Sequence, residues 1–117
     1  MTKRVALATL GCKVNQYETQ VIRERFKRAN FELASFSEEA DIYVINTCSV
    51  TKRADEKSID LIRKALQKNN GASVVVTGCL VEADAEKLKD KFPQVKLVGN
   101  SEKLKLNELF APLDSKH

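Results

Sequence analysis

Three apolar segments, each ending close to a cysteine, constrain the fold of this chain more than any other feature. The segments are Val5–Leu10, Ile42–Thr47 and Val74–Thr77, and the cysteines that follow them are Cys12, Cys48 and Cys79. After each cysteine the apolar residues recur at the spacing of an amphipathic helix. Strands that alternate with helices are typical of a parallel sheet, because parallel strands need a crossover connection. The sequence therefore predicts an α/β fold.

The same reasoning extends to the rest of the chain. Strands are predicted near residues 4–10, 31–34, 41–46, 73–77 and 95–98, and helices near 15–30, 51–69, 82–91 and from 101 onward. Asn15 is the predicted N-cap of the first helix, with Glu18 as its capping-box partner. Residues predicted to face the sheet from the helices are Tyr17, Val21, Ile22, Phe26 and Ala29; Ile59, Ile62, Ala65 and Leu66; Ala85, Leu88 and Phe92; and Leu104 and Leu109. The polar stretch after Ala34 is predicted to cross the sheet without a full helix.

Right-handed crossovers then give a three-layer sandwich of the flavodoxin or Rossmann type, with a mostly parallel sheet of about five strands in the order 2-1-3-4-5. We expect one domain over residues 1–110 and a tail over 111–117. In this order the three cysteine-terminated strands are neighbours about 4.8 Å apart, so the outer two thiols start roughly 10 Å apart. Open α/β sheets keep their sites at this carboxyl edge. The three cysteines are therefore predicted to share a site.

Composition limits the chemistry of such a site. The chain has 117 residues, a net charge of +4 and one histidine, the terminal His117, so catalysis by histidine is not expected. Its apolar runs are far shorter than the roughly 20 residues of a membrane span. The N-terminus lacks the pattern of a signal peptide, and we expect a cytoplasmic protein with reduced thiols.

Three converging thiolates suit soft metals and iron-sulfur clusters. Structural zinc requires four ligands, whereas a 4Fe-4S cluster on three cysteines keeps one iron open. Two alternatives remain at this point: the cysteines are packing residues of a flavodoxin-like binding or regulatory module, or two of them form a redox disulfide, although no Cys-x-x-Cys spacing is present. Asn46 and Thr47 are expected either to donate hydrogen bonds to sulfur or to satisfy the turn. Lys13, Lys52 and Arg53 are interpreted either as a solvated surface or as partners of an anionic cluster or RNA phosphate.

Around these cysteines the chain resembles the N-terminal domain of the radical SAM methylthiotransferases. The motifs are Thr9-Leu10-Gly11-Cys12-Lys13-Val14-Asn15-Gln16-Tyr17-Glu18, Asn46-Thr47-Cys48-Ser49-Val50-Thr51 and Gly78-Cys79. The first is similar to the subgroup that acts on threonylcarbamoyladenosine in tRNA. The resemblance extends over residues 3–110, and the sequence departs from it at Glu82, where the family usually has glutamine.

The resemblance implies that Cys12, Cys48 and Cys79 ligate an auxiliary 4Fe-4S cluster whose open iron supplies sulfur. It also implies a radical SAM domain in cis, with S-adenosylmethionine and a second 4Fe-4S cluster, and tRNA as the substrate of the full enzyme. We expect that domain to follow in the full enzyme, and we expect the 117-residue chain alone to be inactive.

Overall fold

The computed structural model describes residues 3–10, 13–47, 52–68 and 71–99. Five strands and three helices lie in this part of the chain. The strands are β1 (Arg4–Thr9), β2 (Glu32–Ala34), β3 (Ile42–Thr47), β4 (Ser73–Gly78) and β5 (Lys96–Val98). The helices are α1 (Lys13–Arg28), α2 (Lys52–Lys68) and α3 (Cys79–Lys91). The predicted C-terminal helix, with Leu104 and Leu109, lies outside the described residues.

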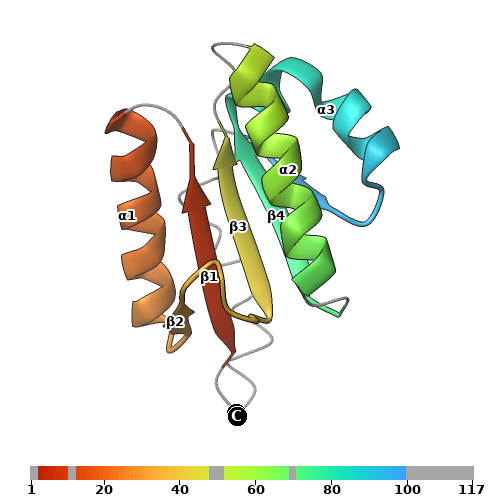
Figure 1. Ribbon diagram of the computed structural model, residues 1–117. Coiled ribbons are helices and arrows are strands. Elements are labelled where there is room, and N and C mark those ends of the chain that lie inside the picture. The colour runs from red at the N-terminus through yellow and green to blue at the C-terminus, as the bar shows by residue number, and fades with distance from the viewer. Residues whose placement is uncertain (1–2, 11–12, 48–51, 69–70, 100–117) are drawn as a thin grey trace.

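The five strands form one sheet in the order β2-β1-β3-β4-β5, and every pair is parallel. The predicted strand order is therefore confirmed. Helix α1 covers one face of the sheet, whereas α2 and α3 cover the other (Figure 1). This gives the three layers of a Rossmann-like sandwich, with the carboxyl ends of β1, β3 and β4 pointing to the same edge.

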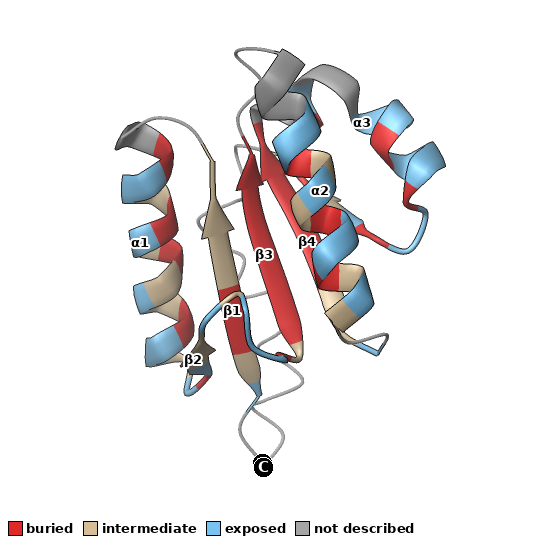
Figure 2. Cartoon of the chain, viewed as in Figure 1, coloured by how far each residue is buried: buried red, intermediate tan, exposed pale blue. Residues whose placement is uncertain are grey.

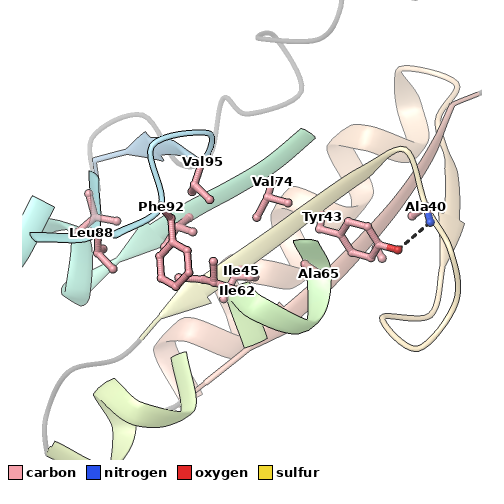
Figure 3. Packing of buried hydrophobic residues seen from close by; sticks show 12 residues of the cluster. Ala40, Tyr43, Ile45, Ile62, Ala65, Val74, Leu88, Phe92 and Val95 are labelled. Atoms are coloured by element: carbon pink, nitrogen blue, oxygen red, sulfur yellow. Dashed lines mark hydrogen bonds between the residues drawn. The ribbon is translucent and has the colours of Figure 1, made fainter. Parts of the chain in front are cut away.

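The core has two parts because the central strands are buried on both faces. All six residues of β3 are buried, as expected for a strand with helices on either side (Figure 2). Tyr43, Ile45 and Val74 pack with Ile62 and Leu88 of the helices on one face (Figure 3). On the other face a second cluster consists of Val5, Ile22, Phe26, Phe31, Ile42, Val44, Val75 and Val98. No helix in the described part of the chain is long and apolar enough to cross a membrane.

The predictions for α1 were wrong at its start. The helix begins at Lys13, so Asn15 lies within its first turn and is not its N-cap. Tyr17 is 71% exposed, because it lies on the opposite side of the helix from Phe26. The face that packs on the sheet consists of Asn15, Thr19, Ile22 and Phe26, all buried. Asn15 and Thr19 are polar, so the pattern of apolar spacing does not include them and includes Tyr17 instead.

The prediction for α3 was wrong in a similar way. The helix begins at Cys79, three residues before the predicted start. Leu88 and Phe92 are buried as expected, together with Val81, but Ala85 is exposed. Ala85 lies roughly 60° around the helix from Leu88, at the solvent side of the packed face.

The connection between β2 and β3 contains no helix over residues 35–41, as predicted. Tyr43 links this connection to the core. The Tyr43 hydroxyl accepts a hydrogen bond from Ala40 N (2.9 Å) and donates one to Glu38 O (2.9 Å). Arg4 Nη2 pairs with Glu38 Oε2 at 3.3 Å, and the Glu38 carboxylate also accepts a bond from Ser35 N at 2.8 Å. The Ser35 amide, followed by the Arg4 guanidinium, lowers the pKa of Glu38.

This lowered pKa predicts a pH-dependent contribution to stability. A carboxylate whose pKa is depressed by folding stabilises the native state above its unfolded pKa, and this contribution is lost as the pH falls through the folded pKa. Glu38→Gln is therefore expected to lower the urea midpoint at pH 7 and to leave it unchanged at a pH below the folded pKa. Glu39→Gln is the matched control, since Glu39 is exposed, adjoins Glu38 and has no ion pair in the described part of the chain. Equal midpoint losses for Glu38→Gln at both pH values would contradict this assignment.

Candidate metal centre at the carboxyl edge of the sheet

The strands that precede the three cysteines end side by side. Thr9 of β1 is in register with Asn46 of β3, which is in register with Thr77 of β4. The next position of β3, Thr47, is in register with Gly78. Leu10 N donates a hydrogen bond to Asn46 O (3.0 Å), which carries the ladder one residue beyond β1. The predicted adjacency of these three strand ends is confirmed.

The structure places the three cysteines unequally. Cys79 is the first residue of α3, directly after Gly78 at the end of β4. Cys12 and Cys48 lie outside the described residues, two positions after Leu10 and one after Thr47. Both are thus tethered by short segments to neighbouring strand ends. No group of three potential metal ligands occurs among the described residues, which do not include Cys12 and Cys48.

A buried asparagine joins two of these strand ends. The Asn15 side-chain amide, from the first turn of α1, donates to Leu10 O (2.9 Å) and to Thr47 O (2.8 Å). Sequence reasoning assigned Asn15 to capping its own helix and missed this role. The available signal was the polar pair Asn15 and Thr19, one turn apart on the same face as Ile22.

Asn46 completes a polar network beneath the edge. Its amide donates to Asn15 O (3.1 Å) and to Thr19 Oγ1 (3.2 Å), and Thr9 Oγ1 donates to Thr19 Oγ1 (2.6 Å). Thr47 Oγ1 donates to Thr77 O at 2.7 Å. These bonds support the expectation that Asn46 and Thr47 satisfy the ends of the strands. Polar groups this deeply buried are stable only when they are hydrogen-bonded, so the network fixes how the strand ends sit together.

Gly78 permits β3 and β4 to end in close contact. Its φ is +104°, a conformation that residues with a Cβ rarely adopt. A Cβ at this position would overlap Thr47 O, lie 2.8 Å from Thr47 N and lie 2.9 Å from Asn46 Oδ1. A glycine before Cys79 is therefore required by both the backbone conformation and the adjacent strand.

All three helices begin at this edge. Helix α1 starts at Lys13, α2 at Lys52 and α3 at Cys79, each within a few residues of a cysteine. A helix N-terminus presents free N–H groups and a partial positive charge, which favours bound negative charge. The edge thus suits thiolates, the form in which cysteine binds metal. The side chains of Lys13, Lys52 and Arg53, predicted to add positive charge here, are not among those described.

A surface groove lies away from the cysteine-bearing edge. A groove of about 460 Å³ is lined by Gln20, Arg23, Glu24, Lys27, Arg28 and Leu33. These residues belong to the later turns of α1 and to the outer strand β2, whereas the cysteine-bearing edge is at the start of α1. The groove is therefore separate from the candidate metal centre.

A family model described as "Uncharacterized protein family UPF0004" matches residues 4–99. The chain belongs to this family. The match begins at β1 and ends just after β5, so the UPF0004 domain corresponds to the five-stranded sheet and its three helices.

Curated relatives of this UPF0004 domain are methylthiotransferases. A threonylcarbamoyladenosine tRNA methylthiotransferase from Bacillus subtilis is 50% identical over 67% of this chain and 17% of its own length. The enzyme of the same name from Aquifex aeolicus is 41% identical over 88% of this chain and 25% of its own length. A ribosomal protein uS12 methylthiotransferase from Sulfurihydrogenibium is 35% identical over 79% of this chain and 22% of its own length.

These matches confirm the resemblance to the N-terminal domain of methylthiotransferases, including the threonylcarbamoyladenosine subgroup. The chain spans about a quarter or less of the length of these relatives. Glu82, where the sequence departs from the family pattern, is an exposed residue of α3 near Gly99, and it lies on the cysteine-bearing half of that helix.

The geometry at Gly78 gives a testable expectation. Gly78→Ala combines an unfavourable φ with overlap against Thr47, and it should lower the free energy of unfolding by about 3 kcal/mol. Gly99→Ala is the matched control, because its Cβ would meet only Glu82 Oε2 at an ordinary 3.6 Å. Urea unfolding of both variants tests the difference, and equal stabilities would contradict the close contact of β3 and β4.

Proposed function

We propose that this domain holds an auxiliary 4Fe-4S cluster on Cys12, Cys48 and Cys79. The observation that carries the proposal is the adjacent ending of β1, β3 and β4, each followed by one of the chain's three cysteines. The donor set fits the group, since iron-sulfur clusters are held by cysteine thiolates and the helix N-termini favour their negative charge. When bound, a cluster with three protein ligands supplies an iron that is open to an exogenous sulfur ligand.

In this function the domain itself holds and orients the three cysteine ligands. Parallel strands deliver the three cysteines to one edge, and the network of Asn15, Thr19 and Asn46 supports two of the strand ends from below. Gly78 brings the third strand end against Thr47.

We infer that the domain works as part of a methylthiotransferase that modifies threonylcarbamoyladenosine in tRNA. The names of the relatives from Bacillus subtilis and Aquifex aeolicus support this substrate. The proposal includes a radical SAM domain in cis, which binds S-adenosylmethionine and a second 4Fe-4S cluster, with tRNA as the partner. It also includes a cytoplasmic location, and the 117-residue chain alone is expected to lack the activity.

Anaerobic reconstitution with iron and sulfide tests the cluster. The 117-residue chain is expected to take up about four irons and to show the brown absorbance of a 4Fe-4S cluster. Cys12→Ser, Cys48→Ser and Cys79→Ser should each lose most of the iron, because two thiolates do not complete the ligand set. Iron uptake that is absent in the wild type, or unchanged in all three variants, would contradict the proposal and favour a module whose cysteines only pack.

A further inference from the structure

We propose that Asn15 is a positioning residue for the three-thiol site, acting through the backbone on Cys12 and Cys48. The inference rests on the proposed function and adds to it a residue that binds neither metal nor substrate. Its basis is the pair of hydrogen bonds from one buried amide group to two different strand ends.

The two acceptors mark the points where the chain leaves the sheet toward the cysteines. Leu10 O is two residues before Cys12, and Thr47 O is directly before Cys48. Because both bonds come from the same nitrogen, the two carbonyl oxygens are held within two hydrogen-bond lengths of each other. The starting points of the two cysteine-bearing segments are thereby fixed relative to one another.

The position of Asn15 itself is fixed from several sides. Its backbone carbonyl accepts a bond from Asn46 Nδ2, and Asn46 also bonds Thr19 Oγ1 on the next turn of α1. Asn15 is 6% exposed and Asn46 is 1% exposed. Through this amide, the position of α1 fixes the positions of the ends of β1 and β3.

The two hydrogen bonds from Asn15 lie beyond the regular pairing of β1 and β3 and do not extend the sheet. The register of β1 and β3 ends at Thr9 and Asn46, and the last ladder bond is from Leu10 N to Asn46 O. Beyond that point, the Asn15 side chain donates hydrogen bonds to Leu10 O and Thr47 O. Loss of residues that hold metal ligands in place typically costs 10- to 100-fold in metal affinity.

A purely structural role is the competing explanation, and Tyr43 provides the matched control. Its hydroxyl also makes two hydrogen bonds to backbone atoms and is fully buried, but these bonds join β3 to residues 38–40 at the opposite end of the strand. Tyr43→Phe and Asn15→Leu each remove two hydrogen bonds, one buried and one part-buried, and each keeps the ring or the branching of the native side chain. A general loss of stability should affect metal binding similarly in both variants.

The test is an anaerobic Cd²⁺ titration of the reduced 117-residue chain, followed through thiolate-to-metal absorbance. Asn15→Leu is expected to weaken Cd²⁺ binding by about tenfold or more, and Tyr43→Phe to leave it unchanged. Thermal unfolding of the metal-free proteins, with similar melting temperatures in both variants, shows that stability is matched. If Asn15→Leu does not fold, Asn15→Ser, which keeps one donor in a smaller side chain, should show an intermediate loss.

The outcomes separate this inference from the proposed function. Equal Cd²⁺ affinity in Asn15→Leu and Tyr43→Phe would overturn the positioning role, while iron uptake by the wild type would still support the cluster. Weaker Cd²⁺ binding in Asn15→Leu alone would support positioning, even if the wild type assembled no iron-sulfur cluster and the proposed function failed. A wild-type chain that binds no Cd²⁺ would overturn the positioning role, since there would be no thiol site to position.

Discussion

The parallel register of β1, β3 and β4 is the constraint on which the rest of this structure depends. Parallel pairing sends Thr9, Asn46 and Thr77 to one row across the sheet and sends the following residues to one edge. Antiparallel pairing of any of these strands would have put its cysteine at the opposite end. The hydrogen bonds of Asn46 and the close approach of Gly78 to Thr47 are specific to this register, because a shift by one residue would break both.

The carboxyl edge differs from the rest of the core in being polar. Ile22 and Phe26 of α1 pack against valines, whereas Asn15 and Thr19 of the same face meet Thr9, Asn46 and two backbone carbonyls. Hydrogen bonds are directional and apolar contacts are not, so this end of the sandwich has a defined geometry as well as a stable packing. We interpret the change from apolar to polar packing as the means by which the fold holds the cysteine-bearing segments in place.

The sequence was sufficient to predict the sheet but not the side-chain contacts at its carboxyl edge. Continuous apolar runs such as Ile42–Ile45 and the helical spacing of Ile62 and Ala65 predicted the parallel sheet and most of the core. Right-handed crossovers of the flavodoxin type predicted the strand order. Asn15 was incorrectly assigned as a helix cap, because an inward-facing polar residue has the same local signal as a cap. Tyr17 was incorrectly assigned to the buried face, because the pattern of apolar spacing selects it over the polar residues that pack there. The bridge from Asn15 to Thr47 spans 32 positions and depends on tertiary packing, which no local pattern encodes.

Anomalous diffraction at the iron edge, from crystals of the anaerobically reconstituted chain, tests the central claim most directly. The account predicts one four-iron cluster at the carboxyl edge of the sheet, with the sulfur atoms of Cys12, Cys48 and Cys79 each within bonding distance of a different iron. Iron bound at another surface, or bound by only one or two of these cysteines, would contradict it.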